Sequence, residues 1–388
     1  MNAHTKPARA AASQPIATAR LTVANAKHAA ATMKRVAGAM WSIPIIRNAL
    51  IHIQADKITF EATDLDRTAV MEFEAETTGQ AAFTIPVQTL YAVANAAIGN
   101  VEISLSPAAP GALNPANVVT LKSDDLTVHS ADLYPVEDFP RFEVPAKETP
   151  HTLTASHDDM ARAFSLGRHC ISTQMTRYYL NGAHITQKPD GNTMRVVTTD
   201  GHRMAVIDTA IPMDGPSIII PSETVDLLTH HLRTGANSTV TVRYYETKIV
   251  IELEGVTLFS KLIDGTYPDY QRVIPTGDAT TIFNLTQTTI KRLARIASAI
   301  NGDYHRGCTL DPIKGEIRTK GENFGGASAP ISGTGETIVT VHGPYLNDQA
   351  KATPTFKVHA MHKYDPLRIY CDDPDALFIL MPMREERP

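Results

Sequence analysis

The sequence predicts an α+β chain built from three tandem copies of one domain. Three segments opening with Leu-Thr begin at Leu21, Leu153 and Leu285, with the same spacing of 132 residues. A second echo reads TDLDRTAV from Thr63 and TDGHRMAV from Thr199. Self-similarity at a fixed period marks one structural unit copied in tandem, and this period is long enough for a whole domain. Three similar domains favour a curved or ring-like scaffold over a single active site.

Each copy is expected to run helix, strands, a short helix after a proline, and more strands. The strand-proline-helix pattern recurs around Pro86, Pro221 and Pro344. Period-two alternation, typical of half-buried strands, predicts strands in four stretches: 49–63, 69–76, 238–253 with a hairpin turn near Glu246-Thr247, and the three short runs between 356 and 383.

Loops and linkers divide the chain between these copies. Residues 106–118 and 325–336 are rich in Pro, Gly and Asn or Ser and are expected to be loops. Residues 144–151 and 274–281 are expected to be linkers, because each precedes a new copy. The predicted division is an N-terminal extension (1–18), a first repeat (19–145), a second repeat (150–275) and a third repeat (280–388).

The first helix of each copy carries basic residues. In the third, Ile290, Leu293, Ala294 and Ala297 form a stripe for burial, and Lys291, Arg292 and Arg295 lie on the other face. Lys27, Lys34 and Arg35 share a face in the first, whereas Arg162 and Arg168 of the second are diluted by Asp158 and Asp159. A solvated face explains any one helix. Recurrence favours a surface that contacts a phosphate backbone without reading its sequence.

Composition is that of an ordinary globular chain. The 388 residues are 43% apolar and 20% charged, with a net charge of −5. No apolar run is long enough for a transmembrane helix, so no membrane association is expected. Three cysteines without metal spacing fit a reducing cytoplasm, and we expect neither a metal nor a cofactor. No acidic residue precedes Asp56, so an organellar transit peptide is an alternative interpretation of the extension.

Several motifs, in order and at domain spacing, resemble one family. They are IPIIRNALI (43–51), EDFP (137–140), RYYLNG (177–182), TTDGHRMAV (198–206), YPDYQRVIP (267–275) and LMPMR (380–384). From about residue 19 to residue 384 the chain resembles the bacterial β sliding clamp, the β subunit and processivity factor of DNA polymerase III.

The resemblance implies three copies of a DNA-clamp domain and a homodimer closed head to tail into a ring. Helices line the inside, antiparallel sheets form the outside, and closure removes the sheet edges. The family is non-catalytic. It encircles double-stranded DNA without sequence specificity. DNA polymerase, the clamp loader and repair proteins bind it through short apolar peptides. By this resemblance the third-repeat helix 287–300, with the small residues Ser298 and Ala299, would face the first repeat of the other subunit.

The resemblance also implies two sets of site residues. The peptide pocket, between the second and third repeats, would use Leu180, Thr199, Gly201, His202, Arg203, Met204, Pro268, Arg272, Val273, Ile379, Met381, Pro382, Met383 and Arg384. DNA contacts would come from Gln174, Tyr178 and Tyr179 and from the basic helix residues Lys27, Lys34, Arg35, Arg162, Lys291, Arg292 and Arg295.

Simpler interpretations stand beside these assignments. Asp200 can cap its own turn, LMPMR can be an edge strand, and Tyr178 and Tyr179 can be core residues. An Asp200/His202 enzyme is a third possibility, but no nucleophile motif accompanies the pair.

The chain also departs from the family pattern. Ala39 and Met40, followed by Trp41, stand where many relatives have arginines, and Gln88 and Ser222 follow prolines where relatives are often basic. A tail, Glu385 to Pro388, extends past the last motif. These departures leave open a clamp paralogue that binds partners but encloses DNA weakly.

Overall fold

The computed structural model describes residues 14–38, 43–107, 117–130, 134–189, 191–233, 238–300, 307–320 and 326–384, with backbone only at 297–300 and 320. Most of the predicted extension, the departures at Ala39 to Trp41, the tail from Glu385 and the side chains of Ser298 and Ala299 lie outside these residues.

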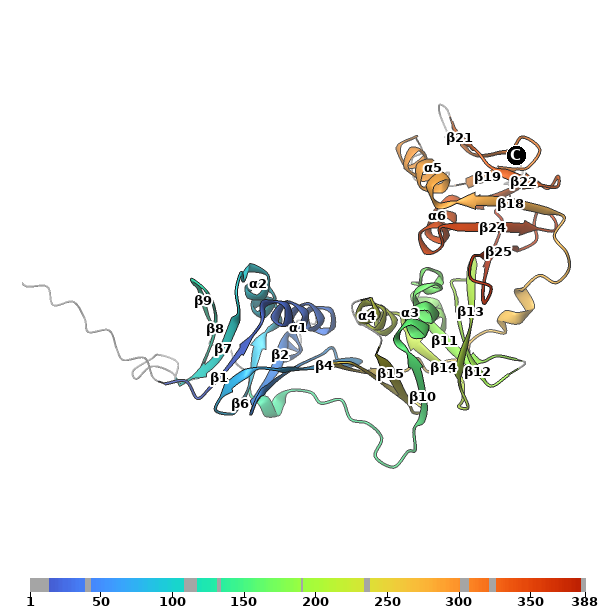
Figure 1. Ribbon diagram of the computed structural model, residues 1–388. Coiled ribbons are helices and arrows are strands. Elements are labelled where there is room, and N and C mark those ends of the chain that lie inside the picture. Colours follow the sequence, from blue (N-terminus) through green and yellow to red (C-terminus); the bar gives the residue numbers. More distant parts are fainter. Residues whose placement is uncertain are drawn as a thin grey trace, which may run out of the picture. The chain divides into compact units, whose positions relative to one another are not determined.

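The same broad order of a strand, a helix, several strands, a second helix and three more strands occurs three times along the chain (Figure 1). The first repeat contains β1 (Ala17–Leu21), α1 (Val23–Val36), η1 (Pro44–Arg47), β2 (Asn48–Gln54), β3 (Lys57–Thr63), β4 (Arg67–Glu74), β5 (Glu76–Thr78), β6 (Ala81–Pro86), α2 (Val87–Ala96), β7 (Val101–Ser106), β8 (Val118–Ser123), β9 (Leu126–Ser130) and η2 (Val136–Asp138).

The second contains β10 (His151–Ser156), α3 (His157–Ser165), η3 (Arg168–Cys170), η4 (Met175–Leu180), β11 (Gly182–Gln187), β12 (Thr193–Thr199), β13 (Arg203–Pro212), β14 (Ile218–Pro221), α4 (Ser222–Leu232), β15 (Thr239–Tyr244), β16 (Lys248–Leu253), β17 (Val256–Lys261) and η5 (Tyr270–Val273). The third contains β18 (Thr281–Thr286), α5 (Gln287–Ile300), β19 (Gly307–Asp311), β20 (Glu316–Lys320), β21 (Gly326–Pro330), β22 (Ser332–Thr334), β23 (Val339–His342), α6 (Gly343–Ala352), β24 (Thr355–Ala360), β25 (Leu367–Cys371) and β26 (Ala376–Leu380).

Side-chain caps fix where the first helix of each repeat begins. The hydroxyls of Thr22, Ser156 and Thr286 accept hydrogen bonds from backbone N–H groups three residues on, at 3.1–3.3 Å. Thr22 and Thr286 belong to the Leu-Thr pairs, but the second cap lies two residues beyond Thr154. The equal spacing of the Leu-Thr pairs therefore does not correspond to an equal spacing of helix starts. The reason is that β10 continues past Thr154 and buries Ala155 as well as Leu153.

The described chain separates into two compact units. The first is residues 1–148 with 248–260, and the second is 149–247 with 261–388. In the first unit α1 packs on α2, one sheet has the order β5-β1-β7-β8-β9, and another contains β17-β4-β3-β2-β6. Within these sheets β3 pairs with β4, and β7 pairs with β8, in antiparallel orientation.

The second unit contains the predicted peptide site. Here α3 packs on α4 and α5 packs on α6. A nine-stranded sheet has the order β14-β11-β12-β13-β26-β25-β24-β18-β22, and a four-stranded sheet has the order β21-β20-β19-β23. Because β13 of the second repeat pairs with β26 of the third, one sheet continues across both repeats.

Candidate functional site

A tight turn between β12 and β13 holds the TDGHR motif. The Asp200 carboxylate accepts hydrogen bonds from the N–H groups of His202 (2.8 Å) and Arg203 (3.0 Å), and it binds the Arg203 guanidinium at 2.9 Å. Gly201 has a φ of 89°, a conformation that most side chains disfavour. Asp200 therefore caps its own turn, and this capping presents Gly201 and His202 to solvent.

Strand pairing brings this turn next to the LMPMR segment. Arg203 pairs with Leu380 and Met204 pairs with Ile379 across β13 and β26. Beyond the strand, the Met381 N–H donates to the His202 carbonyl at 2.8 Å. Two motifs almost 180 residues apart in the sequence are thus adjacent in space.

Beneath these segments lies a buried apolar cluster, with exposed apolar side chains on segments around it. The cluster comprises Val197, Met204, Val206, Tyr270 and Ile379. On the same segments, Val273, Met381 and Met383 are 47%, 38% and 37% exposed. Large apolar side chains that are exposed to solvent next to a buried apolar cluster indicate a surface suited to an apolar partner.

The predicted pocket residues differ in accessibility. Those that are exposed are Gly201, His202, Pro268, Arg272, Val273, Met381, Met383 and Arg384. Those that are partly buried are Thr199, Arg203 and Pro382, and those that are buried are Leu180, Met204 and Ile379. Arg272 makes an ion pair with Asp269 at 2.8 Å. Leu180, at the end of η4, is 3% exposed and does not belong to the buried cluster.

Helix α6 contributes neighbours that sequence reasoning missed. The Arg203 guanidinium binds Asp348 at 2.9 Å and lies 4.4 Å from the centroid of the Tyr345 ring. The Tyr345 ring also stacks near His202, at 6.1 Å between centroids. The strand-proline-helix pattern predicted α6, but nothing in it indicated which residues of α6 face the turn.

The electrostatics of this junction favour the Arg203–Asp348 pair. Burial alone would raise the pKa of the Asp348 carboxyl, but hydrogen bonds from Lys351 and Arg203 hold that pKa below its ordinary value. Burial lowers the pKa of nearby His169 to about 4, and the positive charge of Arg203 acts in the same direction. The His169 ring nitrogen Nε2 lies 3.1 Å from the Gln349 amide oxygen. Like Arg203, His169 therefore contacts a residue of α6.

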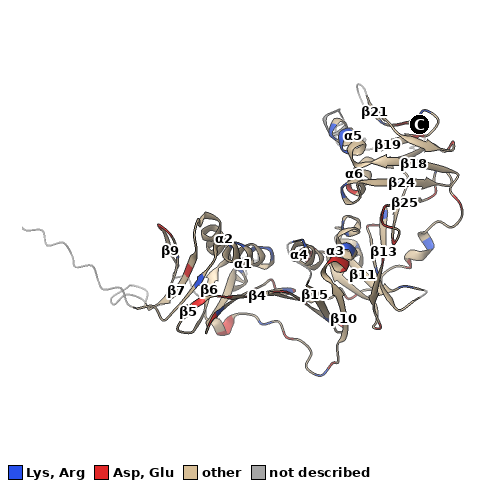
Figure 2. Ribbon diagram, in the orientation of Figure 1, with Lys and Arg blue, Asp and Glu red and all other residues tan. Residues whose placement is uncertain are grey.

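Most of the predicted DNA-contacting cations lie on exposed helix positions. Lys27, Lys34 and Arg35 on α1 and Lys291, Arg292 and Arg295 on α5 are exposed. Figure 2 shows Lys and Arg on both helices, with acidic residues on α3. The Lys34 ammonium lies 3.8 Å from the Tyr91 ring centroid.

The other predicted DNA contacts, Gln174, Tyr178 and Tyr179, differ from one another in exposure. Tyr178 is 54% exposed, so core packing does not account for it, whereas Tyr179 is partly buried. The side-chain oxygen of the exposed Gln174 accepts hydrogen bonds from Arg177, at 2.9 and 2.6 Å.

Arg162 differs from the other predicted cations. Its guanidinium makes two hydrogen bonds to Asp373, at 2.5 and 2.6 Å, and a third to the Asp208 carbonyl at 2.7 Å. These acceptors lie on β13 and on the loop between β25 and β26. Because its donors are committed to protein acceptors, Arg162 joins the second and third repeats and is a weaker DNA candidate than the exposed cations.

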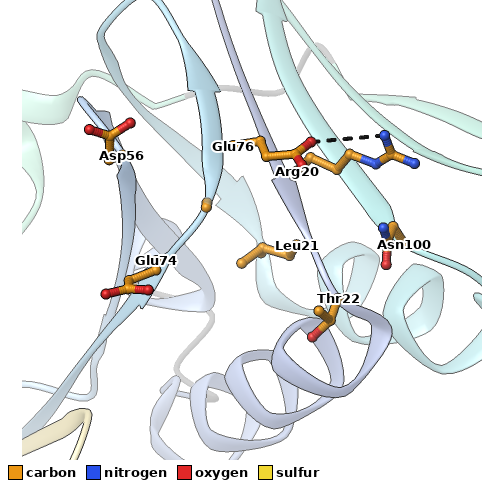
Figure 3. Close-up of a pocket in the computed structure, with 8 residues that line it drawn as sticks. Arg20, Leu21, Thr22, Asp56, Glu74, Glu76 and Asn100 are labelled. Carbon is orange, nitrogen blue, oxygen red and sulfur yellow. Dashed lines mark ion pairs between the residues drawn. The ribbon is translucent and has the colours of Figure 1, made fainter.

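A separate hollow of about 520 Å³ lies in the first unit. Asp56, Glu74 and Glu76 line it with Arg20, whose guanidinium is 3.9 Å from the Glu76 carboxylate (Figure 3). It contains none of the predicted site residues. Three carboxylates against one arginine make it unsuited to a phosphate backbone.

The described residues have neither a metal site nor a membrane-spanning helix. They contain no group of three or more His, Cys, Asp or Glu side chains placed to hold a metal ion. Among the same residues, no helix is long and apolar enough to cross a membrane.

Comparison with known proteins places these features in a family. Residues 155–269 match the family model for the central domain of the DNA polymerase III beta subunit. The chain is 28% identical over 367 residues to the Beta sliding clamp of Caulobacter vibrioides, covering 88% of this chain and 93% of the relative. It is 24% identical to that of Haemophilus influenzae over 360 residues, with the same coverages.

Solved structures give the same result. The DnaN sliding clamp of Bartonella birtlesii superposes with a TM-score of 0.82 at 26% identity, covering 95% of this chain and all of the other. The chain belongs to the bacterial β sliding clamp family. It is therefore a sliding clamp of DNA polymerase III, a class of non-catalytic processivity factors, and the enzyme interpretation of Asp200 and His202 is not supported. Caulobacter crescentus pol III beta has a TM-score of 0.78 at 25% identity, with 95% and 100% coverage.

Proposed function

We propose that two copies of this chain close head to tail into a ring around duplex DNA and hold replication partners through short apolar peptides. The three predicted repeats would each be one clamp domain. In this arrangement the first repeat of one subunit meets the third repeat of the other, and the assembly works in the cytoplasm. The alternative of a paralogue that encloses DNA weakly is not favoured, because the chain matches sliding clamps over most of their length.

The observation that carries the peptide proposal is the exposed trio Val273, Met381 and Met383 beside the buried cluster. Methionine is flexible and polarisable, so it can repack around different partner side chains. Exposed arginines at the edge, Arg272 and Arg384, can bind carbonyl groups or acidic flanks of a peptide. A peptide of Gln-Leu-x-Leu-Phe type has the apolar anchors this surface accommodates.

The double variant Met383→Ala and Arg384→Ala is expected to bind such a peptide at least about tenfold more weakly, a loss of about 1.4 kcal/mol or more. It removes one apolar contact and one edge cation while leaving the buried cluster intact. Fluorescence anisotropy of a labelled peptide measures the change. Ile98→Ala is a matched control, because Ile98 is 87% exposed and lies in the first unit. Equal affinity of wild type and double variant would move the peptide site elsewhere.

The DNA proposal rests on the exposed cations of α1 and α5. Such contacts are non-specific, and each phosphate contact contributes about −0.9 to the slope of log affinity against log salt. Because Gln88 and Ser222 are uncharged, the slope should be shallower than for relatives with cations there. Retention would then depend mainly on ring closure.

Protein loaded by a clamp loader on circular DNA is expected to leave within the dead time once the DNA is cut, because a closed ring slides off free ends. Gel filtration of the DNA before and after restriction digestion measures retention. Circles incubated in the same buffer without the enzyme are the control. Equal retention on linear and circular DNA would indicate tight chemical binding instead of enclosure.

A further inference from the structure

The turn of the peptide site has a close counterpart in the first repeat. In the second repeat the Thr199 hydroxyl donates to the Arg203 carbonyl (2.7 Å), and Asp200 binds the N–H and guanidinium of Arg203. In the first repeat the Thr63 hydroxyl donates to the Arg67 carbonyl (3.0 Å), and Asp64 makes the same two contacts to Arg67 at 2.8 Å. The two turns are therefore the same hydrogen-bonded unit.

The surroundings of the two turns also correspond. Arg67 pairs with Ser260 across β4 and β17, as Arg203 pairs with Leu380 across β13 and β26. A 3-10 helix precedes the first strand of each set, η1 before β2 and η4 before β11. A Tyr-Pro segment followed by a short 3-10 helix comes later in both repeats, at 134–138 and 267–273. The first repeat thus contains a counterpart of the turn and of the elements that flank it.

The two turns differ at one central position. Gly201 is exposed, with a φ of 89° and no side chain. Its counterpart Leu65 has a φ of 80° and packs on the buried cluster of Ile45, Ile46, Leu50 and Phe139. A leucine adopts positive φ rarely, so its packing must compensate for the backbone conformation.

The neighbouring 3-10 helices follow the same division. η1 offers Leu65 the buried side chains of Ile45 and Ile46. η4 instead has Arg177, and a Cβ built on Gly201 would lie 2.5 Å from its Nη1 atom. A leucine side chain therefore fits at the turn of the first repeat. At the turn of the second repeat, glycine lies next to the Arg177 side chain, which is polar and can move.

We propose that Leu65 occupies the first repeat's copy of the peptide site from within the chain, so that this copy is closed and the copy at Gly201 stays open. The proposal rests on the proposed peptide function of the second repeat. It treats Leu65 as an internal substitute for the apolar side chain of a partner. Glycine or leucine at the centre of the turn then determines how many peptides one chain binds.

The experiment counts bound peptides by isothermal titration calorimetry with a Gln-Leu-x-Leu-Phe peptide. The wild type should bind one peptide per chain. Leu65→Gly should add a second, weaker site. Gly201→Leu should weaken the original site at least tenfold. Gly201→Ala adds the same backbone strain and likewise displaces the Arg177 side chain, but it adds only a methyl group, so it should bind within about threefold of the wild type.

Three results would overturn the proposal. A folded Leu65→Gly variant that still binds one peptide would show that Leu65 is only a core residue. Wild-type affinity in a folded Gly201→Leu variant would show that leucine at this position closes nothing, and this result decides the matter if Leu65→Gly fails to melt cooperatively. A wild type that binds no peptide would remove the proposed function itself and this inference with it.

Discussion

Acidification from pH 6.5 to pH 4 is expected to lower the free energy of unfolding by up to roughly 3 kcal/mol for each of two buried histidines, at 1.36 kcal/mol per pKa unit. Burial lowers the pKa of His169 and of His184 to about 4, from an ordinary value of 6.5. Below pH 6.5 the unfolded chain gains protons that the folded chain does not. The stability that these groups contribute is therefore complete above pH 6.5 and is lost as the pH falls towards 4.

Urea unfolding at pH 7 and at pH 4.5 measures this effect at one protein concentration. The double variant His169→Gln and His184→Phe is the comparison. Phenylalanine can keep the stacking on Tyr267, whose ring centroid lies 4.4 Å from that of His184, and it does not titrate. The variant should lose less stability than the wild type between the two pH values. An unchanged pH dependence would mean that other groups, such as His28 or His52, control acid unfolding.

Arg203→Ala is expected to lower stability by about 2–3 kcal/mol and to weaken peptide binding. The variant leaves Asp200 and Asp348, whose side chains are 13% and 32% exposed, without the guanidinium they share. Partly buried carboxylates that lose their partner are costly. The turn would also lose its connection to α6, so Gly201 and His202 would be held less firmly. Thermal melting and peptide anisotropy measure the two effects.

Arg67→Ala is the matched control for this prediction. Arg67 binds Asp64 in the same turn geometry, at 2.8 Å, but among the described residues Arg67 has no second carboxylate partner corresponding to Asp348. It should cost less, about 1 kcal/mol, which is typical of a single partly exposed pair. Its peptide affinity should match the wild type. Equal losses of peptide affinity in the two variants would contradict a special role for Arg203.

Local sequence determined many elements of this protein, but not all of them: residues 326–334, which lie within an expected loop, form β21 and β22. Alternating apolar residues specified β2, β3 and β4, and a proline marked the start of α2, α4 and α6. The basic and apolar faces of α5 also followed from spacing: Ile290 and Leu293 are 3% exposed, and Lys291 and Arg292 are exposed. These features depend on helix and strand periodicity, which a single segment contains. The similarity of the two turns was also visible in the sequence, because their hydrogen bonds join residues at most four positions apart.

Only the tertiary structure decided which distant side chains meet. The sequence placed Arg162 on a basic helix face, yet its guanidinium binds Asp373, 211 residues away. Tyr345 and Asp348 joined the candidate site only when α6 packed beside the turn at Arg203. The sequence showed a leucine and a glycine at matching turn positions. Only the fold showed that Leu65 packs on a buried cluster, whereas Gly201 is exposed beside Arg177. Such contacts depend on strand order and helix packing, which no local pattern encodes.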